Sequence, residues 1–473
     1  MFVLESCKKD PLSVFADYEP EIGRIMTTQC AVSGCHNDLS SQNAFGLNLS
    51  TWAKMVEGGN SGSVVIAHKP EFSSLFQFVN THADLGLMAT PTMPFTSDPL
   101  SREEVILIKT WIEAGCPNRD GEIPFAQGYE DRKKIYFANQ GCDVVTVVDA
   151  ESRLPMRFID VGNSASIIET PHYIKMSPDK KYWYTIFVAG DKFQKYDAAT
   201  DQLLDEVSIG FSSWNVIELS DDGVYAFVSD LSSNGSIKKI NTTNMLVEAT
   251  YSGGNLFVNP HGLALSKTTD TIYATAQFGN ILYRFIPSAP TPKTEILLEP
   301  GAMPATAGSL VQPHEILYSP DKSKLFISCE GSNDIRVISA GVDTLLDIIP
   351  VGVKPKEMVM SASRNLLFVS CMEDPNPTFT ALKGSIYAID MSTLQVVKVI
   401  SDRFSQPRGL AFDEATGELW IANRNISLDG PAPHHTSSCG GRNGFFMVLN
   451  VDNWSIVQGN RELSVDPYSC TIR

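Results

Sequence analysis

The chain has 473 residues, of which 43% are hydrophobic and 19% are charged, as is typical of globular proteins. Its formal net charge of −17 argues against a nucleic-acid partner and against binding to an anionic membrane by charge alone. The length predicts more than one domain, and the sequence has no apolar run of about 20 residues that would predict a transmembrane helix.

The chain begins with a short apolar stub, which leads into Leu4-Glu5-Ser6-Cys7. These four residues resemble the lipobox of bacterial lipoproteins, in which the cysteine is lipidated. The resemblance implies a signal remnant and lipoprotein linker over residues 1–16 and a lipid anchor at Cys7. It also implies an extracytoplasmic place, in the periplasm or at the outer membrane. The alternative is a disordered cytoplasmic N-terminus with an incidental cysteine.

Helical patterns dominate the region before residue 120. Apolar residues at helical spacing predict helices over 20–26 and 73–82. The strongest pattern covers 101–114, where Ser101 and Glu104 form a capping box and an apolar stripe follows. Gly115 and Pro117 predict the end of this helix.

The segment from Cys30 to His36 carries the chemistry of this region, with the pattern C-x4-C-H. In c-type cytochromes two thiols bond to haem and the adjacent histidine ligates iron, usually within C-x-x-C-H. The longer spacer still allows both sulfurs to reach the haem. The alternatives are a structural disulfide, or a zinc site that Cys116 and a further histidine would complete.

Five further features occur in the order found in planctomycete-type cytochrome c domains, which this region resembles over about 17–120. They are Gly46-Leu47-Asn48-Leu49, the glycine-rich turn at 58–65, Pro70-x-x-Ser73-x-Leu75, Met93-Pro94, and a helix ending in Trp111-Ile112-Glu113-Ala114-Gly115. The resemblance implies a haem domain over 17–121 with one covalent haem c, held by Cys30, Cys35 and His36.

The sixth iron ligand is also implied by this resemblance. Met93, which precedes a proline, matches the family's methionine ligand, and Met/His ligation suits electron transfer. Met88 is the second candidate. His68 and His82 are further candidates and would give bis-histidine iron. The alternative role for Met93 is to fill the core.

From about residue 133 the sequence consists of short β-branched and aromatic runs that recur every 40–60 residues, which indicates a repeat architecture. Each repeat has two apolar strands separated by a polar turn, and begins at a proline or tryptophan. The seven repeats begin at Pro171, Trp214, Pro260, Pro313, Pro355, Pro407 and Pro467.

The seventh repeat is cut short by the end of the chain, and residues 133–161 supply its missing strands. One blade built from both chain ends would close a seven-bladed propeller and remove exposed strand edges. The repeats resemble those of YVTN and lactonase-like propellers. We therefore predict a linker at 122–132 and an all-β propeller at 133–473, joined to the small all-α cytochrome c domain. A pair of β-sandwiches is the alternative.

Five histidines lie in the propeller region. Three of them follow the leading proline of a repeat, and two lie in a long loop; they are His172, His261, His314, His434 and His435. Repeat geometry places them around one mouth of the axial channel, where they could bind copper, zinc or iron. The alternative is that the proline-histidine pair is a repeat turn whose imidazole bonds to backbone. Nearby polar candidates are Glu315, Lys356, Glu357, Arg408 and Arg424.

The remaining cysteines suggest a disulfide between Cys142 and Cys470, while Cys329 and Cys371 are either buried thiols or a pair. No catalytic triad, phosphate loop or paired-carboxylate motif is present. We expect an electron-transfer cytochrome that meets a redox partner protein, with the propeller as docking or substrate module. The alternatives are an oxidoreductase with a metal or substrate site at the propeller mouth, and a haem-linked module that binds a protein or glycan.

Overall fold

The structure, a computed structural model, describes residues 17–252, 256–266, 270–380, 382–424, 439 and 444–473. The chain forms two compact units. One comprises Met1–Lys134, Thr146–Phe158 and Asn460–Glu462, and the other Ile135–Val145, Ile159–Gly459 and Leu463–Arg473. Within the described residues no helix is long and apolar enough to cross a membrane. The lipobox at Cys7 lies outside the described residues, so lipidation there stays a prediction.

The helical region contains short helices around one apolar cluster. They are α1 (Pro20–Ile25), α2 (Trp52–Val56), α3 (Ser74–Val79) and α4 (Arg102–Glu113), with a π-helical turn at Met26–Cys30 and 3-10 turns at Ser41–Asn43, Pro70–Phe72, Ala83–Leu85 and Tyr129–Asp131. The capping box of Ser101 and Glu104 is formed. The three helices predicted from the sequence are therefore confirmed, while α2, only one turn long, was not predicted.

The β region is built of four-stranded sheets, of which the described residues form seven. The sheet made from both chain ends holds β28 (Pro467–Ile472), β1 (Lys134–Asn139), β2 (Val144–Asp149) and β3 (Leu154–Asp160). The second sheet holds β4 (Pro171–Met176), β5 (Tyr182–Phe187), β6 (Lys192–Asp197) and β7 (Leu203–Ser208). The third holds β8 (Trp214–Leu219), β9 (Tyr225–Asp230), β10 (Ile237–Asn241) and β11 (Leu246–Tyr251). The fourth holds β12 (Pro260–Ser266), β13 (Thr271–Ala276), β14 (Ile281–Ile286) and β15 (Ala289–Leu297). The fifth sheet holds β16 (Pro313–Tyr318), β17 (Lys324–Cys329), β18 (Asp334–Ser339) and β19 (Leu345–Pro350). The sixth holds β20 (Val353–Ser361), β21 (Leu366–Glu373), β22 (Ser385–Asp390) and β23 (Gln395–Ser401). The seventh holds β24 (Pro407–Asp413), β25 (Glu418–Asn423), β26 (Phe445–Asn450) and β27 (Ser455–Glu462).

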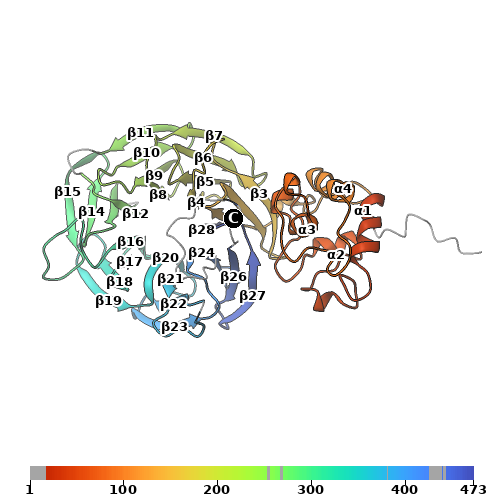
Figure 1. Ribbon diagram of the computed structural model, residues 1–473. Coiled ribbons are helices and arrows are strands. Elements are labelled where there is room, and N and C mark those ends of the chain that lie inside the picture. The colour runs from red at the N-terminus through yellow and green to blue at the C-terminus, as the bar shows by residue number, and fades with distance from the viewer. Residues whose placement is uncertain (1–16, 253–255, 267–269, 381, 425–438, 440–443) are drawn as a thin grey trace, which may run out of the picture. The chain divides into compact units, whose positions relative to one another are not determined.

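These sheets are the blades of a seven-bladed propeller, as predicted. Figure 1 shows the innermost strands around a common centre, and each contacts the innermost strands of both neighbouring blades until the ring closes. Six of the seven predicted repeats begin at the first residue of an innermost strand, and Pro355 is the third residue of β20. The closing blade is composite as expected, with β28 antiparallel to β1 and Phe137 opposite Cys470.

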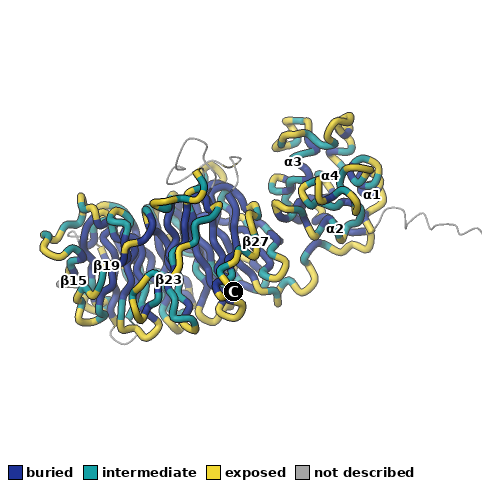
Figure 2. Tube along the Cα trace, turned by 90° about the horizontal axis from the view of Figure 1, so that it is seen from below, coloured by how far each residue is buried: buried dark blue, intermediate teal, exposed yellow. Residues whose placement is uncertain are grey.

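Burial changes from the inner to the outer strand of a blade. All six residues of β1 and of β2 are buried, whereas the outer strand β23 is largely exposed. Figure 2 shows this as buried stretches running through the blades, with exposed residues at the turns. Inner strands packed on both faces need continuous apolar runs, while outer strands need only one apolar face.

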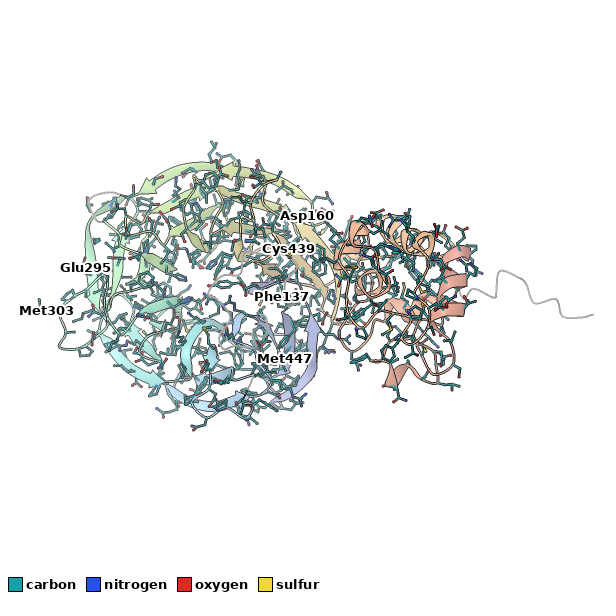
Figure 3. The ribbon with its side chains drawn as sticks, viewed as in Figure 1. Phe137, Asp160, Glu295, Met303, Cys439 and Met447 are labelled. Carbon is teal, nitrogen blue, oxygen red and sulfur yellow. A yellow bond between two sulfur atoms is a disulfide. The ribbon has the colours of Figure 1, made fainter. Side chains whose placement is uncertain are left out.

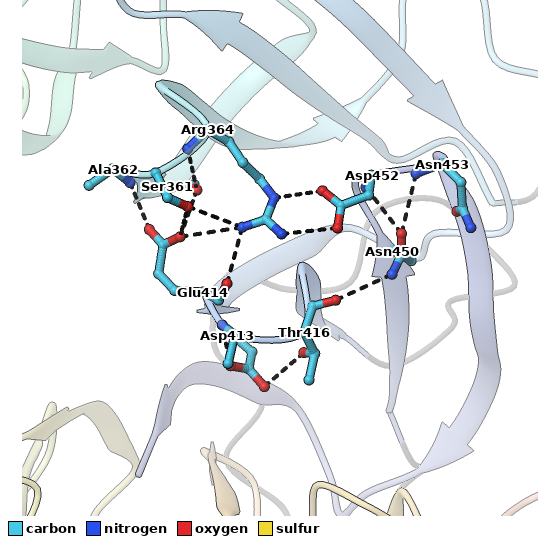
Figure 4. Close-up of polar contacts among 11 residues, drawn as sticks. Ser361, Ala362, Arg364, Asp413, Glu414, Thr416, Asn450, Asp452 and Asn453 are labelled. Atoms are coloured by element: carbon cyan, nitrogen blue, oxygen red, sulfur yellow. Dashed lines mark hydrogen bonds and ion pairs between the residues drawn. The ribbon is translucent and has the colours of Figure 1, made fainter.

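Neighbouring blades are also joined at the surface by a polar cluster around Arg364, in the turn between β20 and β21 (Figure 4). The Arg364 guanidinium donates to both carboxylate oxygens of Asp452, at 2.7 and 3.0 Å. It also donates to the backbone carbonyl of Glu414, whose carboxylate accepts from the backbone of Ala362. The cluster therefore connects turns of the blades that begin with β20 and β24.

The predicted disulfide between Cys142 and Cys470 is wrong. Cys142, in the turn between β1 and β2, is bonded instead to Cys439, which Figure 3 labels. Cys470 is a buried free thiol in β28, and Cys329 and Cys371 are buried free thiols as well. Sequence order put Cys470 in the same blade as Cys142, but Cys470 lies within a strand, opposite Phe137, and not beside the turn.

We expect Cys439→Ser to lower the free energy of unfolding by about 2–4 kcal/mol, because the bond closes a chain segment of 297 residues in the unfolded state. Guanidinium unfolding with and without a reductant measures this. With reductant, the wild-type protein should unfold at the same denaturant concentration as the variant. Equal midpoints without reductant would show that the bond does not stabilise the fold.

Candidate functional site

Cys30 and Cys35 lie at the two ends of a tight loop that follows α1. Cys30 ends the π-helical turn and is buried, whereas Cys35 is half-buried, and both are free thiols. The backbone N–H of Cys35 donates to the carbonyl of Val32, and that of His36 donates to the carbonyl of Cys30, at 3.2 Å. The loop thus folds back, so the four-residue spacer keeps His36 next to Cys30.

Cys30 belongs to the apolar cluster of the helical region, together with residues of α1, α3 and α4. Burial, with smaller contributions from Cys35 and Glu104, raises the pKa of the Cys30 thiol to about 12. The thiol is therefore protonated at neutral pH and faces an apolar environment. The structural-disulfide alternative is not realised in this geometry, since neither cysteine of the loop is bonded.

The described residues give the His36 side chain one polar contact. Its Nδ1 lies 3.3 Å from the carbonyl oxygen of Leu47, which fixes Nδ1 as the donor. Burial lowers the pKa of the imidazole, and the contact with the Leu47 carbonyl offsets this only in part. At neutral pH the ring is therefore neutral, with the lone pair on Nε2. This is the form and orientation in which histidine ligates a metal.

Met93 and Met88 differ in their surroundings. Met93 packs against the same apolar cluster that holds Cys30, and its backbone N–H donates to the carbonyl of Phe78 at 2.8 Å. Met88 is 53% exposed. The surroundings of Met93 thus suit a thioether ligand better than those of Met88, although they also suit a methionine that only fills the core.

The two other histidines of the helical region, His68 and His82, differ in their hydrogen bonding. His68 Nδ1 lies 2.9 Å from the carbonyl oxygen of Glu113, whereas His82 Nε2 is buried and has no hydrogen-bond partner among the described residues. In the part of the chain that the structure describes, no three His, Cys, Asp or Glu side chains converge on a metal position. The zinc alternative therefore lacks its set of ligands here.

These residues fit a covalently bound haem. The loop offers two free thiols and a neutral imidazole with an available Nε2, next to an apolar cluster. Large apolar side chains in and after the loop are exposed, including Leu39 at 98% and Phe45 at 76%. Exposed apolar surface of this kind indicates an apolar ligand or partner, and a porphyrin is an apolar ligand.

The three propeller histidines that the structure describes do not gather as metal ligands. His172 Nδ1 lies 2.6 Å from the side-chain amide nitrogen of Gln140, and His261 Nδ1 contacts the backbone carbonyl of His314 at 3.1 Å. His314 Nε2 lies 3.1 Å from a guanidinium nitrogen of Arg408. His434 and His435 lie outside the described residues, so their part in a metal site stays a prediction.

From the sequence we did not predict the aromatic and acidic groups that lie near the propeller histidines. Tyr468 occupies the repeat position of the histidines, and its ring lies 4.2 Å from that of His172. Asp466 and Glu330 pair with two buried cations, Arg424 and Lys356. Tyr468 could have been found by aligning the seven repeats at the residue after the leading proline. The two acids lie outside that position, so only the fold identifies them.

The family described as Planctomycete cytochrome C matches residues 33–89. The match includes Cys35 and His36, begins after Cys30 and ends before Met93. No curated protein matches this chain. The family match thus supports a cytochrome c-like region in the helical part of the chain.

Among solved structures, a protein of unknown function from Desulfotomaculum acetoxidans has a TM-score of 0.51 and 13% identity, over 71% of this chain and 99% of its own. The hydrazine synthase of Kuenenia stuttgartiensis has a TM-score of 0.43 and 14% identity, over 63% and 97%. The dihydro-haem d1 dehydrogenase NirN has a TM-score of 0.47 and 12% identity, over 87% and 93%. At these identities the likeness concerns the fold alone. The chain therefore combines a region similar to planctomycete cytochrome c with a seven-bladed β-propeller.

Proposed function

We propose that this protein is a monohaem c-type cytochrome of the bacterial envelope that transfers single electrons. In this proposal Cys30 and Cys35 bind haem c covalently, His36 ligates the iron and Met93 is the sixth ligand. The observation that carries the proposal is the loop from Cys30 to His36, in which two free thiols are followed by a fixed, neutral imidazole. The match to a cytochrome c family at residues 33–89 supports it.

The chain's own residues would set the properties of the site. Bound haem would supply a one-electron iron couple. The Leu47 carbonyl holds the His36 ring and increases the basicity of its Nε2. The apolar cluster around Cys30 and Met93 would keep water away from the haem, and Met93 as an iron ligand would raise the reduction potential.

An oxidising compartment is part of this proposal. Disulfides persist mainly outside the cytoplasm, and the bond between Cys142 and Cys439 is consistent with that location. A lipid at Cys7 would hold the protein at the membrane, in the periplasm or at the outer membrane. A single lipid chain binds membranes only weakly, so further acyl chains would be needed for a stable anchor.

The propeller, which we take to be of the YVTN or lactonase-like type, would serve as a docking or substrate module for a redox partner protein. A second candidate function is an oxidoreductase whose substrate binds at the mouth of the propeller. The observation that favours it is the set of buried, charged side chains there, including Lys356, Arg408 and Arg424.

The experiment that tests the cytochrome is a reduced-minus-oxidised visible spectrum of protein produced in a host with cytochrome c maturation. Acid-acetone extraction and metal analysis accompany it. We expect a haem spectrum that resists extraction, with one iron per chain. A colourless protein from that host would contradict the proposal. Additional copper, zinc or iron would point to a metal site that includes His434 and His435.

A further inference from the structure

One repeat position in the propeller supplies a ring of buried polar side chains, one from each blade. We name it the mouth ring: it consists of His172, Asn215, His261, His314, Lys356, Arg408 and Tyr468. Each residue follows the leading proline or tryptophan of its repeat and lies near the start of an innermost strand, and all seven are buried. The innermost strands surround the centre of the propeller (Figure 1), so the mouth ring lies around the axis.

Arg408 contacts two other members of the mouth ring. It comes from β24, and its Nη2 lies 3.1 Å from Nε2 of His314, which comes from β16. The blade of β20–β23 lies between these two strands in the ring, so the contact joins two blades that are not adjacent. The Arg408 guanidinium also lies over the Tyr468 ring, 3.7 Å from its centroid. Arg408 is fully buried between these two groups.

Two neighbouring cations have acidic partners. Lys356 Nζ pairs with Glu330 at 2.5 Å, and Arg424 donates to both carboxylate oxygens of Asp466, at 2.5 and 2.9 Å. Burial and the charge of Arg408 lower the pKa of Lys356 to about 7. Burial is also the main cause that lowers the pKa of Arg408 to about 10, and Arg424 adds to that effect.

Arg408 forms no such ion pair with any residue that the structure describes. Its Nε and Nη1 are buried and make no hydrogen bond to the described residues. Glu357 acts on it by charge, but the Glu357 carboxyl is hydrogen-bonded to Glu315. A buried guanidinium with two unpaired N–H groups is costly unless an acceptor binds to them. The groups left open are thus hydrogen-bond donors on a cation.

These donors select the class of ligand. A guanidinium edge binds two oxygens of one carboxylate or similar oxyanion in parallel. Nε and Nη1 lie on different edges, and each shares its edge with Nη2. Since Nη2 has two N–H groups and His314 accepts from one of them, one edge stays open. A metal ion would be repelled by Arg408, Lys356 and Arg424, and the neighbouring His314 Nε2 already accepts from Arg408. We propose that the mouth ring binds a small oxyanion of the carboxylate class on the edge of the Arg408 guanidinium that the contact with His314 leaves open. This inference does not depend on haem.

The test is binding of simple anions to the full chain. Sodium chloride is replaced stepwise by sodium acetate, nitrate, sulfate or phosphate at constant ionic strength, and the thermal midpoint is followed. We expect a saturable rise with acetate, because a ligand that binds only the folded state stabilises it. A saturable rise with nitrate alone would also support the site, since nitrate is a planar oxyanion like carboxylate. A rise with sulfate or phosphate alone would overturn the proposal of a planar oxyanion.

Two variants decide whether Arg408 is the site. Arg408→Lys keeps the positive charge but loses the bidentate guanidinium edge, so the apparent affinity for acetate should fall by about tenfold or more. Arg364→Lys, at the exposed cluster of Figure 4, should bind acetate as the wild type does. No saturable rise with any of the four anions would overturn the proposal, and so would unchanged binding by Arg408→Lys. If that variant does not fold, a crystal of wild type grown in acetate decides: an anion on the open edge of the Arg408 guanidinium, at Nη2 together with Nε or Nη1, supports the site, and water alone overturns it.

Discussion

The double substitution Cys30→Ser and Cys35→Ser is expected to remove essentially all covalently bound haem from protein made in a host with cytochrome c maturation. Serine is close in size to cysteine but does not form a thioether. Its hydroxyl is costly in the apolar cluster that contains Cys30, so the control must carry the same cost. The measurement is haem stain after denaturing electrophoresis, combined with the visible spectrum. Each single substitution should leave haem attached through one bond.

The matched control for these variants is Cys116→Ser, a buried free thiol in the same cluster. It should keep its haem, because Cys116 lies outside the loop. If the double variant in the loop retained haem that resists acid-acetone extraction, the assignment of both thiols would be wrong. If Cys116→Ser lost haem as completely, the loss would reflect damage to the helical region rather than missing thioether bonds.

The axial ligand can be identified by the same approach. Met93→Ala should keep covalent haem and lower its reduction potential, since a methionine ligand raises that potential. Met88→Ala should change neither, because Met88 is half exposed and lies outside the cluster. His82, whose Nε2 is buried and unpartnered, is the competing ligand. If the reduction potential changed in His82→Ala but not in Met93→Ala, the assignment of methionine would be wrong, and His36 and His82 would be the two iron ligands.

The propeller was predictable because its repeats carry the same local signals many times. A leading proline, an apolar strand and a polar turn recur in each unit, and the incomplete last copy at Pro467 predicts closure with residues 133–161. The capping box at Ser101 predicts α4 in the same local way. Such signals depend on neighbours within a few residues, so the sequence alone displays them.

The site details depend on contacts between distant residues, which no local signal records. Cys142 and Cys439 are 297 residues apart, and only the position of a loop relative to the first turn decides their pairing. The contact between His314 and Arg408 likewise joins two blades that are not adjacent. The sequence placed both residues at the mouth, but it did not indicate that Arg408 would keep unpaired donors.

Asp466→Asn is expected to destabilise the folded protein by about 3–5 kcal/mol. Asp466 and Arg424 are both fully buried and form a pair with two hydrogen bonds. The substitution removes the negative charge and leaves the Arg424 cation buried without its compensation. Asparagine has nearly the same shape and also tolerates the left-handed conformation of this residue, with φ of 57°. Urea unfolding measures the loss.

The matched control is Asp452→Asn, which breaks a similar pair with Arg364 at the surface (Figure 4). Exposed ion pairs contribute little because water solvates both groups, so this variant should unfold at the wild-type urea concentration. Equal losses in the two variants would mean that burial does not determine the effect. No loss in Asp466→Asn would mean that the charge of Arg424 is compensated by other groups.

The buried pair also has a place in the closure of the ring. Asp466 directly precedes β28, its backbone carbonyl accepts from the N–H of Gln140 just after β1, and its side chain holds Arg424 at the end of β25. Removing the charge should therefore loosen the composite blade before the others. Hydrogen exchange in Asp466→Asn should increase first in β1 and β28. A uniform increase over all blades would show that the pair supports the fold as a whole and that closure is not its particular role.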